Sequence, residues 1–403
     1  MKFTIISQTK TGERKQAVID APDKFAAAKI VRDLGEFPIS ATPWKPAQQF
    51  SDVFAHFFSR ITLHEKILFT RNLSGMLSAG LSLYRALDVL KKQSANQKLS
   101  SVLEALMKTI DSGGSLSAAM EKFPKVFSTI FIAMVKAGEE SGSLAKSLKE
   151  IGVHLEKEYT LIKKIKGAMT YPMIIVAAVF LIGILMFIFV VPTLVNTFAE
   201  LDAELPSSTK IVIFISNALS KHTLLFFGIL FSTGISLYFL SKLRSVKYGF
   251  EYCLLRIPVI GLITKEVNAA RTTRTLASLL AAGVSVTRAI LITRDVIQNH
   301  FYKEVLATVA NNVEKGVPIS KAIKENIQLY PVMVGEMIEV GEETGNLSVM
   351  LSDIASFYED EVDLKTKDLT TIIEPILMIL IGAAVGFFAI SMITPMYSLV
   401  NAI

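Results

Sequence analysis

The residues of this sequence best suited to bind a partner or a cation are two pairs of adjacent glutamates. Glu139-Glu140 lies in the segment GEESG, and Glu342-Glu343 lies in the matching segment GEETG. Each pair precedes a predicted helix, so its carboxylates could form a partner-binding or cation-binding corner at a helix junction. They could instead be structural, because a carboxylate near a helix N-terminus is stabilised by the helix dipole while it stays solvated. Both interpretations remain open, and the duplication favours a shared structural role first.

Two arginines form a second set of candidates for partner binding. Arg71 and Arg274 stand at the first position of two similar blocks of 17 residues. Their guanidinium groups could bind carboxylates of a partner or pair with the glutamates described above, and the spacing does not choose between these roles. The other acidic residues of interest are expected on a solvated helix face, namely Glu156, Glu158, Glu359, Asp360, Glu361 and Asp363.

The sequence contains no pattern typical of catalysis, nucleotide binding or a metal site. It has no glycine-rich loop followed by Lys-Ser or Lys-Thr. His64-Glu65 lacks the second histidine of a zinc-protease helix, and the other four histidines are scattered singly. The single Cys253 excludes a disulfide framework and a multi-thiolate zinc site. We therefore expect no enzyme activity, no catalytic residue, no metal and no cofactor.

The composition indicates a membrane protein with large polar parts. The chain has 403 residues, of which 51% are hydrophobic and 19% charged, and its mean hydropathy is +0.47. Soluble domains carry roughly 25% charged residues, so this chain is too apolar for that class. A disordered chain is excluded as well, because disorder requires a polar, charge-rich composition.

Three stretches without a formal charge predict transmembrane helices, at 173–195, 223–241 and 375–397. The first contains 23 residues, which as a helix would measure about 34 Å. That length is sufficient to cross a hydrocarbon core of ~30 Å. Between the first two spans, residues 196–222 are expected to form a periplasmic loop and a surface helix.

The basic residues predict how the chain is oriented. Lysines and arginines gather before the first span and after the second, at Lys157, Lys163, Lys164, Lys166, Lys242, Arg244, Lys247 and Arg256. The positive-inside rule places both of these flanks in the cytoplasm. The N-terminal apolar run is too short for a signal peptide. We therefore expect a cytoplasmic N-terminus and a periplasmic C-terminus.

An internal repeat with an offset of 203 residues organises the chain. The block 71–87 matches 274–290 at 8 of 17 positions, and 135–148 matches 338–351 at 6 of 14. Each copy combines a helical bundle with one predicted span. The middle span has no counterpart in the repeat, and its predicted task is to return the chain to the side where it began.

The expected fold class is mainly α, with two duplicated cytoplasmic helical bundles of about six helices each and three transmembrane helices. The bundles are expected at 64–172 and 242–372, from apolar residues that recur at helical spacing. A small N-terminal αβ module at 1–45 is predicted from short alternating segments around a helical stretch. Residues 46–63 are expected to be a linker.

Glycines and serines mark the expected boundaries of the bundle helices. Turn positions are predicted at Gly80, Gly138, Gly142, Gly283, Gly341 and Gly345. The expected N-cap residues are Ser82, Ser117, Ser285 and Ser320.

The order of these motifs resembles the GspF/PilC family of inner-membrane platform proteins of type II secretion systems and type IV pili. The resemblance rests on FTRNLSGMLSAGLSL, GEESGSL, the YP before the first span and VVP near its end. The second half repeats the set as TTRTLASLLAAGVSV, GEETGNL, EP and ITP. One departure is that Glu374 stands where the first copy has Tyr171, so the two helix entries are not equivalent.

The resemblance implies a multi-pass protein of the inner membrane that hydrolyses nothing itself. It implies that the protein couples a cytosolic assembly ATPase to the insertion of pilin or pseudopilin subunits. Other inner-membrane assembly proteins and the lipid bilayer are the further expected partners, with a homodimer or a higher oligomer and no nucleic acid. Whether the machine secretes proteins, extends a pilus or takes up DNA stays open.

Two other classes of protein remain as alternatives. A transporter or channel subunit can be built on an internal repeat, but here the spans carry no charge, and their prolines, Pro192 and Pro395, lie near the ends. A membrane enzyme needs a base or metal ligands at bilayer depth, and the serines of the spans are accompanied by no His, Asp or Lys. The sequence favours the platform interpretation.

Overall fold

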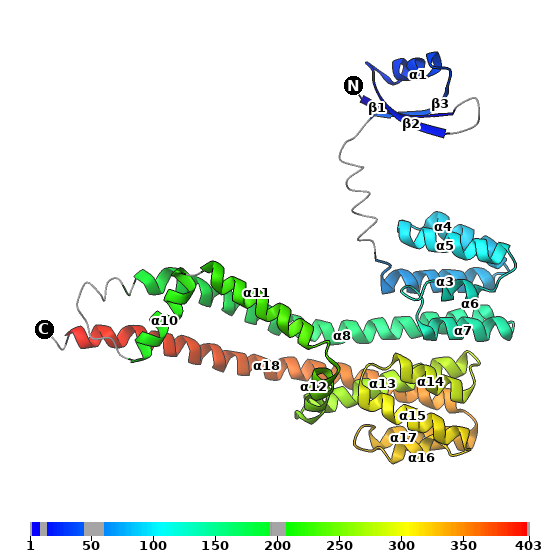
Figure 1. Cartoon of the computed structure of the whole chain (residues 1–403). Helices are drawn as coiled ribbons and strands as arrows, with labels where there is room; N and C mark the ends of the chain where they lie inside the picture. Colours follow the sequence, from blue (N-terminus) through cyan, green and yellow to red (C-terminus); the bar gives the residue numbers. More distant parts are fainter. Residues whose placement is uncertain are drawn as a thin grey trace. The chain divides into compact units, whose positions relative to one another are not determined.

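The computed structural model describes residues 2–8, 14–43, 60–193, 195, 207–221 and 223–400 (Figure 1). Residues 46–59 of the predicted linker and residues 196–206 and 222 of the predicted periplasmic segment lie outside the described residues. The chain divides into two units, one formed by Met1–Ile61 with Lys91–Glu104 and the other by Thr62–Leu90 with Ala105–Ile403.

The N-terminal segment folds into a three-stranded sheet with one helix. Strands β1 (Lys2–Gln8), β2 (Arg14–Asp20) and β3 (Phe37–Pro43) lie in the order β2-β1-β3, and both pairings are antiparallel. Helix α1 (Lys24–Asp33) begins at Asp23, whose carboxylate accepts hydrogen bonds from the backbone N–H groups of Phe25 and Ala26. Alternate residues of β1, Phe3 and Ile5, point to one face and share a core with α1.

The first copy of the repeat is a series of helices that ends in a very long one. The elements are α3 (Leu63–Ser78), α4 (Leu83–Gln93), α5 (Gln97–Asp111), α6 (Leu116–Glu121), α7 (Thr129–Glu140) and α8 (Leu144–Leu185). Thr62 and Glu65 form a capping box at the start of α3. The aromatic rings of Phe69, Phe127 and Phe131 pack in series inside this copy, with centroids 6.1 and 5.1 Å apart.

The second copy repeats this order of helices. After α12 (Arg244–Arg256) the elements are α13 (Ile260–Ala281), α14 (Val286–Val296), α15 (His300–Glu314), α16 (Ile319–Lys324), α17 (Val332–Thr344) and α18 (Leu347–Val400). Buried Tyr302 and Tyr330 pack edge to face at 5.0 Å between centroids. Their hydroxyls are satisfied, because Tyr302 donates to the carbonyl of Leu329 at 2.6 Å and Tyr330 lies 3.2 Å from the hydroxyl of Thr272.

The glycines predicted at turns divide into two groups. Gly80, Gly142, Gly283 and Gly345 follow helices and have φ values of 87°, 66°, 88° and 69°, the left-handed region that favours glycine.

Gly138 and Gly341, contrary to the expectation of a turn, lie inside α7 and α17. A Cβ on Gly138 would lie 2.6 Å from the Cβ of Ser147 in α8, and a Cβ on Gly341 would lie 3.0 Å from the Cα of Leu347 in α18. Glycine is therefore needed at these two positions for close helix packing and not for a special backbone conformation.

Of the expected N-cap residues, Ser285 is the N-cap of α14, whereas Ser117 and Ser320 are not N-caps. The N-cap of α6 is Ser115, whose hydroxyl accepts a hydrogen bond from the N–H of Ala118, and the N-cap of α16 is Pro318. Ser117 and Ser320, predicted as N-caps, are the second residues of these helices, two positions after the N-cap.

Two helices run out of the repeats as long apolar segments. Of the described residues, Leu144–Thr193 and Leu347–Ser391 are long and apolar enough to cross a membrane. The first continues from α8 through a π-helical turn, η1 (Met186–Val190). The second predicted span, 223–241, coincides with α11 (Thr223–Leu240), of which the described apolar part, Phe231–Leu240, is shorter.

Helices α8 and α18 lie side by side and point the same way (Figure 1). The hydroxyl of Tyr171 lies 3.4 Å from Glu374 Oε1, and further along the rings of Phe187 and Phe388 are 6.3 Å apart. Because both contacts join nearly equivalent positions of the repeat, the two helices pack in parallel and almost in register.

Helix α10 (Ser207–Lys221) occupies the described part of the segment expected to be a loop and a surface helix. Instead of standing apart, it packs against η1 and the far part of α18, where Val212 is buried against Val191. The hydroxyl of Ser216 donates to the carbonyl of Phe187, and that of Thr209 donates to the carbonyl of Ser391, both at 2.6 Å. These bonds satisfy hydroxyls among apolar helices, which explains why a helix with polar residues packs there.

Candidate interaction site between the two repeats

Glu139 and Glu342 cap the short helices of their own repeats. The carboxylate of Glu139 accepts hydrogen bonds from the backbone N–H groups of Leu116 and Ser117 at 2.5 and 3.0 Å, and from the Ser117 hydroxyl at 2.5 Å. The first turn of a helix leaves its N–H groups without intrahelical partners, and a negative charge there also meets the positive end of the helix dipole. Glu139 is thereby held inside its own bundle.

The second copy reproduces this arrangement. The carboxylate of Glu342 accepts from the N–H groups of Ile319 and Ser320 at 2.6 and 3.1 Å, and from the Ser320 hydroxyl at 2.5 Å. The structure thus gives the first glutamate of each pair the structural role, even though the sequence left both roles open.

The second glutamate of each pair, Glu140 and Glu343, is exposed. Glu140 lines a groove of about 720 Å³ between α7 and the turn that joins α13 to α14. Lys136 of α7 and Arg288 of α14 also line it, so the groove carries both signs of charge on its walls. The structure therefore leaves the carboxylate of Glu140 accessible to a partner.

Arg71 and Arg274 pair with acids that the sequence analysis placed on a solvated face, and neither forms an ion pair with the two glutamate pairs among the described residues. Arg71 Nη2 lies 3.8 Å from Glu156, and the side chains are 66% and 50% exposed. Arg274 Nε lies 2.7 Å from Glu359, and these side chains are 9% and 10% exposed. Arg274 and Glu359 each follow their counterparts, Arg71 and Glu156, by the repeat offset of 203 residues. The same ion pair therefore occurs in both copies, exposed in the first and buried in the second.

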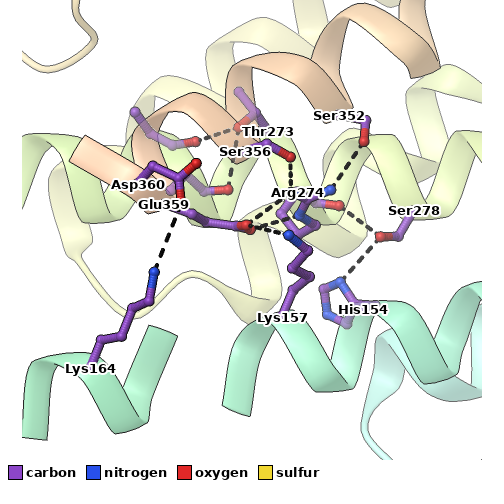
Figure 2. A network of polar contacts seen from close by, with 12 residues as sticks. His154, Lys157, Lys164, Thr273, Arg274, Ser278, Ser352, Ser356, Glu359 and Asp360 are labelled. Carbon is purple, nitrogen blue, oxygen red and sulfur yellow. Dashed lines mark hydrogen bonds and ion pairs between the residues drawn. The ribbon is translucent and has the colours of Figure 1, made fainter. Parts of the chain in front are cut away.

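The buried copy is the centre of a polar network (Figure 2). The guanidinium of Arg274 donates two hydrogen bonds to the carboxylate of Glu359, at 2.7 and 3.0 Å. It also donates to the hydroxyls of Ser352 and Ser356, at 3.1 and 2.8 Å. A buried ion pair is stable only when such additional bonds satisfy its remaining donors.

The first repeat reaches this network through α8. Lys157 Nζ lies 3.4 Å from Glu359, and Lys164 Nζ lies 3.8 Å from Asp360 (Figure 2). Lys164 Nζ also lies 3.3 Å from Asp363. We call these three lysine-to-acid contacts, together with the Arg274–Glu359 pair, the inter-repeat latch. It joins α8, α13 and α18 just before the two long helices become apolar.

His154 contributes a neutral contact between the same helices. Its Nδ1 lies 3.2 Å from the hydroxyl of Ser278, which itself donates to the carbonyl of Arg274 at 2.8 Å. Since a serine hydroxyl has one hydrogen, this geometry requires a proton on Nδ1 of His154. Burial lowers the pKa of His154 to about 4, and the charge of Arg274 acts in the same direction.

The latch and the polar side chains around it include residues that the sequence analysis did not select as site candidates, namely Lys157, Lys164, His154, Ser352 and Ser356. A signal for its central pair was present, because Arg71–Glu156 and Arg274–Glu359 have the same separation of 85 residues. No comparable signal identifies the lysines, since they meet their acids only across the two repeats.

The inter-repeat latch holds α8, α13 and α18 together, and the groove that Glu140 lines is open to a partner. Within the described part of the chain, no group of three or more His, Cys, Asp or Glu side chains is placed to hold a metal ion. Cys253 is exposed.

Comparison with known proteins gives a consistent result over the whole chain. The family described as "Type II secretion system (T2SS), protein F" matches twice, at residues 69–192 and 272–395. The chain is 31% identical to the type IV pilus assembly protein PilC of Myxococcus xanthus, over 100% of this chain and 96% of that protein. It is 33% identical to the PilC protein of Thermus thermophilus, over 98% of each chain. The type II secretion system protein F of Pseudomonas aeruginosa is 26% identical, also over 98% of each.

Proposed function

The chain belongs to the family of type II secretion system protein F, and from this membership we propose that it is a non-catalytic platform protein of the inner membrane. In a type II secretion or type IV pilus machine, its two repeats bind the cytosolic assembly ATPase. Its apolar helices then pass the motion of the ATPase to pilin or pseudopilin subunits. Other inner-membrane assembly proteins surround it, and a homodimer or higher oligomer provides the complete platform.

The observation that supports this coupling role most directly is the inter-repeat latch. It ties α8 and α18 together where both leave the repeats. Each helix is continuous from the repeat into its apolar segment. Because an uninterrupted helix transmits a displacement along its axis, movement of either repeat would shift both apolar segments together.

The parallel packing of α8 and α18 supports a topology with three spans. Two spans that cross in the same direction require an odd number of crossings between them. Helix α11 has 18 residues, which corresponds to about 27 Å, close to the thickness of a hydrocarbon core. We assign α11 as the returning span, which leaves both repeats in the cytoplasm and the C-terminus in the periplasm.

Deletion of the gene in its own organism tests the function. Loss of surface pili would assign the chain to a pilus machine, and loss of secretion of folded proteins would assign it to a secretion machine; the intact gene should restore either. Normal piliation together with normal secretion in the deletion strain would refute the proposal.

The contact with the ATPase is tested at the exposed glutamates. Glu140→Lys should reduce copurification of the ATPase, because it reverses a charge in the groove while the capping bonds of Glu139 stay intact. Glu343→Lys tests the same position of the second copy, and Asp111→Lys, at an exposed residue at the end of α5, is the matched control. Unchanged copurification in both glutamate variants would remove these residues from the interface.

A further inference from the structure

A groove lies between α8 and α18 on the apolar side of the inter-repeat latch. Its volume is about 540 Å³, and its walls include Lys163, Lys164 and Gly167 of α8 and Asp363, Lys367 and Thr371 of α18. The groove is open at Gly167, since no heavy atom lies within 4 Å of the position a Cβ would take there. The cavity therefore has room for a group larger than a few water molecules.

The walls of this groove carry an excess of positive charge. Three lysines line it against a single carboxylate, that of Asp363. Asp363 lies 3.3 Å from Lys164 Nζ and 3.1 Å from Lys367 Nζ, so it is shared by two of the lysines. Lys163 is exposed, and Thr160 adds a hydroxyl to the walls, whereas the hydroxyl of Thr371 donates to the carbonyl of Lys367. This donor set is suited to an anion with several oxygen atoms, such as a phosphate group.

The groove lies where both helices become apolar. On α8, exposed apolar side chains follow the groove directly at Met169, Met173 and Ile174. On α18, the exposed Ile372 stands next to the groove residue Thr371, and Ile376 follows it. Lys164 precedes Met169 by five residues, and Lys367 precedes Ile372 by five, which is about 7.5 Å along a helix. The polar headgroup layer of a bilayer is roughly 5–8 Å thick on each side, so the groove stands at its level.

We propose that this groove binds the phosphate headgroup of an anionic phospholipid from the cytoplasmic leaflet. The lysines and the hydroxyl of Thr160 hold the phosphate, and the acyl chains follow the apolar surfaces of α8 and α18 away from the groove. The lipid would then bridge the two helices next to the latch. This inference rests on the proposed insertion of α8 and α18 in the membrane, and it is independent of any contact with the ATPase.

Retention of lipid by the purified full-length chain in non-ionic detergent tests this site. Native mass spectrometry compares added phosphatidylglycerol with phosphatidylcholine, and inorganic phosphate is added as a competitor. We expect phosphatidylglycerol to be retained preferentially. Each lysine near a membrane surface contributes about a fivefold gain in affinity for anionic lipid. Lys163→Gln/Lys367→Gln should therefore weaken retention about 25-fold, and Asp363→Asn should strengthen it, because it removes the competing carboxylate.

The matched control is Lys146→Gln/Lys149→Gln, which removes the same charge from exposed positions of α8 far from the groove. It should retain phosphatidylglycerol like the unchanged chain, and circular dichroism verifies that every variant is folded. Equal retention of the two lipids, or equal loss in the groove and control variants, would overturn the proposal. Displacement of lipid by inorganic phosphate at millimolar concentration would show that the site takes a free anion instead. A chain that does not fractionate with membranes would refute the insertion itself, a result separate from the lipid comparison.

Discussion

At the scale of single residues, the two copies of the repeat place equivalent side chains in different surroundings. Arg71–Glu156 is solvated, whereas Arg274–Glu359 is enclosed by α13 and α18 and joined by Lys157 from the other repeat. The sequence analysis named both arginines as candidates but did not identify Glu156 and Glu359 as their partners. It could not show which copy is buried, because burial arises from the packing of one repeat against the other.

Arg274→Met is therefore expected to destabilise the chain far more than Arg71→Met. Removing one partner of a buried ion pair leaves an uncompensated charge and costs about 3–5 kcal/mol. In Arg274→Met, Lys157 would neutralise part of the charge left on Glu359 and so reduce this cost. An exposed pair contributes about 0–1 kcal/mol. Thermal unfolding of both variants in detergent measures the difference. Equal midpoints for the two variants would contradict the burial of the second copy.

His154 predicts a specific dependence of stability on pH. Its pKa is about 4 in the folded chain and 6.5 when unperturbed. Between these values the unfolded chain binds more protons than the folded chain, so the free energy of unfolding falls as the pH is lowered from about 6.5 to about 4. The loss should reach about 3 kcal/mol. The His154→Gln chain lacks the imidazole that binds this proton, so its free energy of unfolding should fall by about 3 kcal/mol less over the same pH interval. Parallel profiles of the free energy of unfolding against pH for the two chains would refute the assignment.

At the scale of elements, helix order is readable from the sequence, whereas tight contacts between helices are not. The positive-φ glycines after α3, α7, α13 and α17 stand at predicted turn positions, because a left-handed residue leaves a recognisable mark at the end of a helical pattern. Gly138 looks the same in the sequence, but its role depends on the distance to Ser147 in another helix. Likewise, the cap that Glu139 places on α6 joins segments 22 residues apart and has no local signature.

Gly138→Ala tests the close packing of α7 on α8. The added methyl group would overlap the side chain of Ser147, and overpacking of this kind costs about 1–3 kcal/mol. Gly152→Ala in α8 is the matched control, because a Cβ there meets nothing within 4 Å and alanine favours a helix by about 1 kcal/mol. The two substitutions should thus shift the unfolding midpoint in opposite directions, and Ser147→Gly should partly rescue Gly138→Ala. A Gly138→Ala chain as stable as the control would exclude the steric argument.

At the scale of the whole molecule, the repeat in the sequence predicts two similar copies but not how the two copies pack against each other. The internal repeat of the sequence predicts two similar bundles, and the model of the family matches the chain once in each copy. The parallel contact of α8 with α18 at equivalent positions follows from neither composition nor charge, because it depends on how the copies associate. The same is true of α10, whose polar residues suggested a place outside the bilayer although it packs against η1 and α18.

The assignment of α11 as the returning span predicts which residues lie on each side of the membrane. If α11 crosses once between α8 and α18, Cys253 lies in the cytoplasm and Lys210 on the opposite side. Both residues are exposed, so a membrane-impermeant maleimide can report on them. In cells with a permeabilised outer membrane, Lys210→Cys in a Cys253→Ser background should be labelled. The natural Cys253 should react only after the inner membrane is opened. Labelling of both positions from the same side would mean that α11 does not cross, and α8 and α18 could then not run parallel through one bilayer.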